Sequence, residues 1–143
     1  MEQTALFFGS FNPIHIGHMV IAETILTHAD MREVWFVVSP QNPLKPVQSL
    51  LPDHQRLEIV RQSTRNDPRF AVCDIEFDRP RPSYTHNTLQ HLAIRHPDRQ
   101  FAIVMGSDNL DNFHRWRHYE QILDQYDIYV YPRPSHDGGT LKS

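Results

Sequence analysis

Five short apolar segments alternate with segments of helical pattern along the 143 residues of this chain. The apolar segments span residues 5–8, 34–38, 70–75, 101–105 and 128–131. Apart from Asp74, each is continuously apolar, which is typical of strands buried on both faces of a parallel sheet. The segments between them carry apolar residues at helical spacing over residues 17–27, 53–60, 85–95 and 119–123. Asp53 is the expected cap of the second of these helices.

The alternation predicts an α/β fold, with a doubly wound parallel sheet of about five strands and helices on both faces. In such a sheet, ligands bind outside the carboxyl ends of the strands. We expect one domain over residues 1–134, followed by a loose polar tail over residues 135–143.

The charge balance and the cysteine content restrict the partners and the compartment. The chain has 14 basic and 17 acidic residues, a net charge of −3, so we expect neither nucleic acid nor a membrane as a partner. The lone cysteine, Cys73, cannot form an intrachain disulfide, which suits the reducing cytoplasm. No apolar segment approaches the length that spans a membrane, and the N-terminus lacks the pattern of a signal peptide.

The segment after the first predicted strand, residues 9–18, is the most informative about chemistry. Gly9 and Gly17 allow close approach to the backbone, and His15 and His18 lie three residues apart at the start of the next helix. This spacing puts both imidazoles on one side of the first turn, where the helix also offers free N–H groups and a positive dipole end. Together these groups suit phosphate oxygens.

Two other interpretations of the histidines stay open at this point. They could be a metal pair, although no nearby cysteine or carboxylate completes a set of ligands. They could also be incidental surface residues. The loop is neither the dinucleotide fingerprint nor a P-loop, because no Gly-Lys-Ser/Thr follows.

Residues 9–18, with His15-Ile16-Gly17-His18, resemble the signature of the HxGH nucleotidyltransferases, a superfamily with a Rossmann-like fold. Family members more often have Gly-Gly-Thr-Phe-Asp-Pro before the histidines, where this chain has residues 9–13, Gly-Ser-Phe-Asn-Pro. The phosphopantetheine enzymes of the superfamily usually have Thr at the position of His15, which argues against that branch.

Three later segments are similar to those of the bacterial nicotinate mononucleotide adenylyltransferases. Residues 40–45 follow the second strand and carry Asn42 and Lys45, although Lys45 alone could be a solvated charge. Residues 82–89 read Pro-Ser-Tyr-Thr-His-Asn-Thr-Leu and contain Tyr84 and Thr85. Ser83 or Thr85 would cap the helix there in any case. The free N–H groups of this helix start could also hold the carboxylate of nicotinate.

The third similar segment, residues 105–110, carries Gly106 and Asp108 after the fourth strand. Trp116 then matches a family tryptophan implicated in stacking on the pyridine ring, although a tryptophan here could equally belong to the core. Arg133, before Pro134, resembles an Arg-Pro pair near the nucleotide.

The resemblance implies transfer of AMP from ATP to nicotinic acid mononucleotide, a step of NAD synthesis, by a cytoplasmic enzyme that could be a homo-oligomer. It implies catalytic roles for His15, His18 and Lys45. The implied ATP-binding residues are Gly9, Ser10, Phe11, Gly17, His18, Gly106, Asp108 and Arg133. The implied residues for the mononucleotide are Asn42, Tyr84, Thr85 and Trp116. The implied Mg²⁺ ion is held by the ATP phosphates, and we expect no direct protein ligand to it.

One family feature is missing. Family members continue past the fifth strand to an Ile-Ser-Ser-Thr-x-Ile-Arg-like motif that helps to hold the ATP phosphates, and this chain reaches Ser143 without it. We therefore expect a shortened chain, whose activity at this length stays open. The alternatives are another HxGH nucleotidyltransferase, with nicotinamide mononucleotide or a different phosphate acceptor, and a non-catalytic nucleotide-binding module.

Overall fold

The computed structural model describes residues 2–40, 51–78, 84–107 and 113–132. In chain order its elements are β1 (Glu2–Gly9), α1 (Ile16–His28), β2 (Glu33–Val38), α2 (Asp53–Thr64), β3 (Phe70–Cys73), the 3₁₀ helix η1 (Ile75–Asp78), α3 (Thr85–Arg95), β4 (Arg99–Gly106), the 3₁₀ helix η2 (Phe113–Arg115), α5 (Tyr119–Gln125) and β5 (Asp127–Tyr131). Four predicted site residues, Asn42, Lys45, Asp108 and Arg133, lie outside the described residues, as does the predicted tail over residues 135–143. None of the described helices is long and apolar enough to cross a membrane.

The five strands form one parallel sheet in the order β3-β2-β1-β4-β5. β1 lies at the centre, where Phe7 is in register with Phe36 of β2 and Val104 of β4. The chain adds strands to one side of β1 and then crosses to the other side, so the order reverses between β1 and β4. The predicted doubly wound α/β fold is therefore confirmed.

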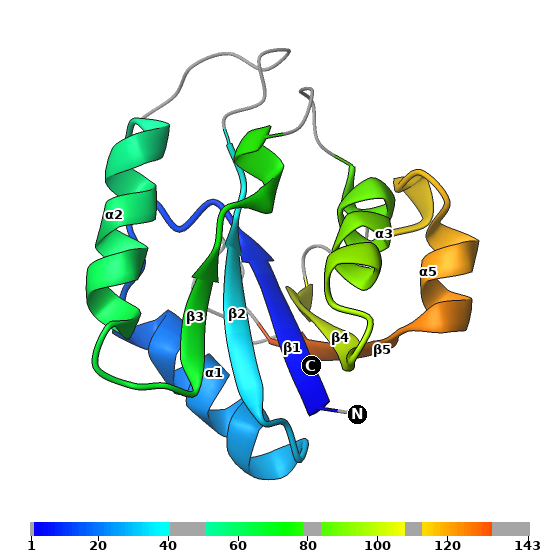
Figure 1. The fold of residues 1–143 in the computed structure, drawn as a ribbon, viewed down its shortest axis with the longest axis horizontal. Helices are drawn as coiled ribbons and strands as arrows, with labels where there is room; N and C mark the ends of the chain where they lie inside the picture. The colour runs from blue at the N-terminus through cyan, green and yellow to red at the C-terminus, as the bar shows by residue number, and fades with distance from the viewer. Residues whose placement is uncertain (1, 41–50, 79–83, 108–112, 133–143) are drawn as a thin grey trace.

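Alternate side chains of the central strands face two hydrophobic cores. Phe7 belongs to the core that α1 and α2 cover, and Leu6 to the core that α3 and α5 cover. Figure 1 shows α1 and α2 on one side of the sheet and α3 and α5 on the other. Each Phe or Leu buried in this way contributes about 1.5–3 kcal/mol, which explains why the predicted strands carry unbroken apolar runs.

Three local predictions were wrong. Pro52, not Asp53, is the N-cap of α2, and the Asp53 carboxylate instead pairs with Arg56 at 2.6 Å. Tyr84 is the N-cap of α3, so Thr85 is the first helical residue and does not cap the helix. The third strand stops at Cys73, because the chain turns there into η1, where the Phe77 N–H donates to the Asp74 carbonyl at 2.9 Å.

Candidate active site

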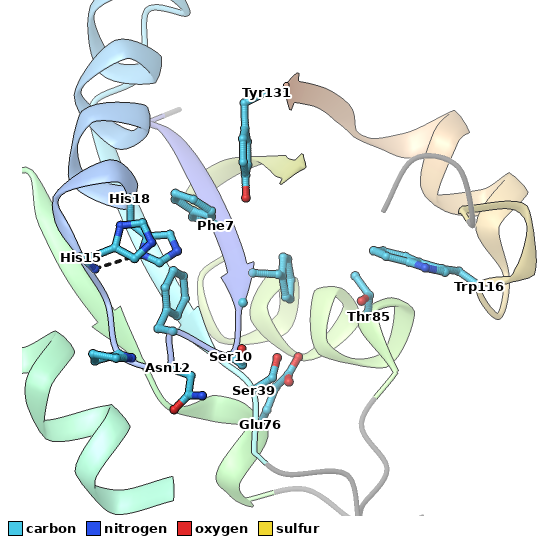
Figure 2. A pocket seen from close by; sticks show the side chains of 14 residues that line it. Phe7, Ser10, Asn12, His15, His18, Ser39, Glu76, Thr85, Trp116 and Tyr131 are labelled. Carbon is cyan, nitrogen blue, oxygen red and sulfur yellow. Dashed lines mark hydrogen bonds between the residues drawn. The ribbon is translucent and has the colours of Figure 1, made fainter. Parts of the chain in front are cut away.

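A cavity of about 610 Å³ opens at the carboxyl ends of the strands. It extends from the loop after β1 to the loops after β2 and β3 on one side and to the end of β5 on the other (Figure 2). The lining residues are Phe7, Phe8, Gly9, Ser10, Phe11, Asn12, Pro13, His15, His18, Ser39, Glu76, Thr85, Trp116 and Tyr131. The place is the one expected for a ligand in a doubly wound sheet, and the volume suits a small-molecule site.

His15 and His18 cap the start of α1 reciprocally. His15 is the N-cap residue, and its Nδ1 accepts a hydrogen bond from the Gly17 N–H at 3.0 Å. The Nδ1 of His18 accepts from the His15 N–H, also at 3.0 Å. Figure 2 shows the two rings lying against each other, and their centroids are 3.9 Å apart. The histidines therefore satisfy backbone donors that a helix start otherwise leaves without partners.

The capping bonds fix which nitrogen of each ring can donate. A backbone N–H only donates, so each Nδ1 must be an acceptor, and each neutral imidazole carries its proton on Nε2. Both rings line the cavity, so the site holds two Nε2–H donors suited to phosphate oxygens. A metal-ligating imidazole ordinarily carries its proton on Nδ1 while Nε2 binds the metal, so this arrangement does not fit the metal-pair interpretation. In the described part of the chain, no three His, Cys, Asp or Glu side chains gather to hold a metal ion.

Gly17 is required by the position of the His15 ring. A Cβ atom added at Gly17 would lie 2.8 Å from Cε1 and 3.0 Å from Nδ1 of His15, which is closer than van der Waals contact allows. Gly17 was predicted to bind ATP, but it does not line the cavity. The absence of a side chain at this position instead lets the imidazole lie against the backbone of the first turn.

Phe11 packs against the imidazole of His18. Its side chain is only 3% exposed, and its ring meets that of His18 edge-on with the centroids 5.0 Å apart. Its backbone has a φ of 49°, in the left-handed region that residues other than glycine rarely adopt. Phe11 thus borders the cavity as part of the packed wall that holds His18.

The structure brings together seven of the predicted site residues that it describes: Gly9, Ser10, Phe11, His15, His18, Thr85 and Trp116. Three others, Gly17, Gly106 and Tyr84, do not line the cavity. Gly106 is buried at the end of β4. The ring of Tyr84 lies against the guanidinium of Arg117, 4.3 Å from its centroid.

Sequence reasoning missed several lining residues, among them Ser39, Glu76 and Tyr131. Ser39 directly follows β2 and Tyr131 ends β5, so their places at strand ends were a usable signal. In Figure 2 the Tyr131 side chain points into the cavity from the side opposite Glu76. Glu76 had a weaker signal, a carboxylate between two apolar residues soon after a strand.

Glu76 is a buried carboxyl group, only 3% exposed, in the cavity wall. Its Oε2 accepts a hydrogen bond from Thr88 Oγ1 at 2.9 Å. Burial raises the pKa of Glu76 above its usual value, while hydrogen bonds from Thr88 and Ser39 oppose this shift in part. Glu76 thereby links η1, α3 and the end of β2 at the cost of burying a charge.

Replacing Glu76 with Gln should make stability less dependent on pH. A carboxyl group whose pKa is raised by folding favours the folded state most at low pH, and this contribution is lost as the pH rises through the folded-state pKa. We expect the stability of Glu76→Gln relative to the wild type to increase from about pH 4 to about pH 8. Urea unfolding of both proteins across this range measures the difference. A stability of Glu76→Gln that falls relative to that of the wild type as the pH rises would contradict the raised pKa.

A model of the cytidylyltransferase-like family matches residues 6–141. The chain belongs to the cytidylyltransferase-like family. The match begins within β1 and covers the other described strands and the histidine motif, so the cavity at the strand ends lies within the family domain.

Named relatives narrow the place of the chain within the cytidylyltransferase-like family. It is 49% identical over 137 residues to the "Probable nicotinate-nucleotide adenylyltransferase" of Cytophaga hutchinsonii, an alignment that covers 96% of this chain and 71% of the relative. It is also 49% identical over 132 residues to the protein of the same name from Flavobacterium psychrophilum, with 92% of this chain and 68% of the relative covered. The predicted resemblance to the nicotinate mononucleotide adenylyltransferases is therefore confirmed.

A solved structure with low sequence identity supports the fold. The nicotinic acid mononucleotide adenylyltransferase of Plasmodium falciparum, complexed with NaAD, aligns with a TM-score of 0.70 at 18% identity. The alignment covers 92% of this cytidylyltransferase-like chain and 75% of that structure.

Proposed function

We propose that this chain transfers AMP from ATP to nicotinic acid mononucleotide, giving nicotinic acid adenine dinucleotide and pyrophosphate. The observation that carries the proposal is the pair of stacked imidazoles at the start of α1, both held as Nε2–H donors beside a cavity of about 610 Å³. The names of the relatives at 49% identity favour the same reaction.

The reaction needs no covalent bond to the protein. A phosphate oxygen of the mononucleotide attacks the α-phosphorus of ATP and forms a new P–O bond. The bond from that phosphorus to the oxygen bridging the α- and β-phosphates breaks, and pyrophosphate leaves with the electron pair. His15 and His18 donate from Nε2 to phosphate oxygens, on which charge accumulates in the transition state. Lys45 assists the two histidines in this proposal.

The other walls of the cavity would hold the two substrates. Gly9 and Ser10 border the triphosphate side with the imidazoles, joined in this proposal by Asp108 and Arg133. Trp116, half-buried against Phe113 with ring centroids 5.0 Å apart, offers an aromatic face on the other side. The first turn of α3, which begins at Thr85, offers backbone N–H groups to an anionic carboxylate. We assign the nicotinate ring to this second side, and we propose binding roles toward the mononucleotide for Tyr84 and Asn42.

Adenylyl transfer from ATP generally needs a divalent metal ion. We propose Mg²⁺, held by the ATP phosphates and by water, because Mg²⁺ keeps much of its hydration shell when it binds with nucleotides. When bound, the ion neutralises phosphate charge. The pair of Nε2–H donors fits such a charged triphosphate, since donors of this kind bind phosphate oxygens and leave metal ligation to the substrate.

A direct assay tests the proposed reaction. The purified chain, incubated with ATP, Mg²⁺ and nicotinic acid mononucleotide, should release pyrophosphate and dinucleotide in equal amounts, and a chelator of divalent ions should stop both. A parallel incubation with nicotinamide mononucleotide should be slower by about tenfold or more, because it lacks the carboxylate that the start of α3 would bind. ATP binding without pyrophosphate release would indicate a non-catalytic nucleotide-binding module. Faster turnover of nicotinamide mononucleotide would indicate a different acceptor.

A further inference from the structure

Arg56, in the first turn of α2, is a charged side chain with no exposed surface. Its Nε donates to the carbonyl of Leu51 at 3.0 Å. Its Nη1 donates to the carbonyls of Ser10 and Ser39, the latter at 2.9 Å. Its Nη2 donates to Oδ1 of Asp53 at 2.6 Å. A buried guanidinium is stable only when its donors are satisfied in this way, so the arrangement has a strict geometry.

The three carbonyl groups belong to chain segments at the edge of the cavity. Ser10 follows β1 and Ser39 follows β2, and both line the cavity. Leu51 is held on its other side too, because its N–H donates to Oδ1 of Asn12, a lining residue, at 2.8 Å. Arg56 itself does not line the cavity. The Arg56 guanidinium therefore joins the loops after β1 and β2 from outside the cavity.

We propose that Arg56 is a positioning residue for nucleotidyl transfer, which holds the loops after β1 and β2 in the geometry that the phosphate site needs. The inference rests on the proposed function. Ser10 lies five residues before His15 in the same loop, so a displaced loop would move the imidazoles relative to ATP. In-line transfer is sensitive to displacements of about 1 Å, which can cost about a hundredfold in rate.

The chemistry of arginine explains why this position needs it. The planar guanidinium presents five N–H donors in a fixed fork, and four donor contacts are made here in different directions. A lysine would keep the positive charge but has three donors on a single nitrogen, so it cannot reach all three carbonyls at once. A carbonyl oxygen without its donor would present negative charge beside an anionic substrate.

The matched pair Arg56→Lys and Val60→Ala tests the proposal. Val60 is buried one turn further along α2 and packs in the core, so its truncation destabilises the helix without touching the loops. At a temperature where both variants are folded, we expect Arg56→Lys to lower kcat by about tenfold or more, with a smaller change in the KM for ATP. Val60→Ala should keep kcat within about twofold of the wild type. Equal kcat in the two variants at equal stability would overturn the proposal.

Hydrogen exchange of the backbone gives a second measurement that does not depend on turnover. In Arg56→Lys, the amides around residues 9–12 and residue 39 should exchange faster than in the wild type, whereas those of Val60→Ala should not. Failure of the wild type to form product would count against the proposed function alone, and the exchange result would still decide the role of Arg56. Unchanged exchange in these loops would overturn that role.

Asp53→Asn replaces Arg56→Lys if the lysine variant does not fold. It keeps an oxygen acceptor for Nη2 and leaves the three carbonyl contacts in place, so we expect lower stability from the loss of the counter-charge but, at a temperature where the variant is folded, a kcat within about threefold of the wild type. A tenfold lower kcat in Asp53→Asn would show that turnover depends on the ion pair between Asp53 and Arg56. That result would overturn the proposal that Arg56 acts through its contacts with the carbonyl groups.

Discussion

Replacing His18 with Ala is expected to lower kcat by about a hundredfold or more, the usual cost of removing one donor to a transition-state oxyanion. The variant loses the Nε2–H donor of a residue that lines the cavity and also the Nδ1 that accepts from the His15 N–H at 3.0 Å. Steady-state rates of pyrophosphate release measure the loss. His28→Ala, an exposed histidine in the last turn of the same helix, is the matched control and should leave kcat unchanged.

A second substitution at this position separates its two roles. Asn has a side-chain oxygen that can accept from the His15 N–H, but it offers no donor at the position of the imidazole Nε2. His18→Asn should therefore recover most of the stability that His18→Ala loses, without recovering turnover. If Asn restored the rate as well, the role of His18 would be that of a helix cap alone.

Replacing Gly17 with Ala is expected to lower kcat by about ten- to a hundredfold, although the substituted atom does not face the cavity. The new Cβ would lie 2.8 Å from Cε1 of His15, so the ring must move and the stack with His18 must open. Alanine is also favoured over glycine inside a helix by about 0.5–1 kcal/mol. We therefore expect activity to fall while the thermal midpoint changes little.

Ile16→Ala is the control for this prediction, because Ile16 precedes Gly17 in α1, is 81% exposed and does not line the cavity. Its kcat should stay within about twofold of the wild type. Wild-type turnover in Gly17→Ala would show that the position of the His15 ring does not matter for the reaction.

Local patterns in the sequence were sufficient to predict the fold. The unbroken apolar runs are strands because the sheet is covered on both faces, and the loops at the carboxyl ends meet because the strands are parallel. The same logic placed His15 and His18 at the cavity, and the family resemblance added Thr85. Strand and helix ends were less accurate, as at Asp53, whose carboxylate has a stronger partner in Arg56 than in the helix N–H groups.

The buried polar groups could not be predicted in this way. Arg56 contacts the carbonyl of Ser10, 46 residues earlier in the chain, and no local pattern distinguishes it from a solvated arginine on a helix. Glu76 has the same difficulty, since its partner Thr88 is 12 residues away on another helix. The reciprocal caps were missed for a different reason, because histidine is not among the preferred N-cap residues. The roles of Asn42, Lys45, Asp108 and Arg133 stay predictions.

The reciprocal caps at the start of α1 suggest that the histidine pair can be transferred to another protein. Four of the contacts that define the pair, two hydrogen bonds, one ring stack and the close approach over Gly17, lie within residues 15–18, while Phe7 and Phe11 add edge-on contacts to the His18 ring. A designer could graft His-Xaa-Gly-His onto the first turn of an unrelated helix and obtain two oriented donors without importing the rest of the domain. Such a transplant would bind phosphate esters weakly, and its affinity would report how much the surrounding loops add.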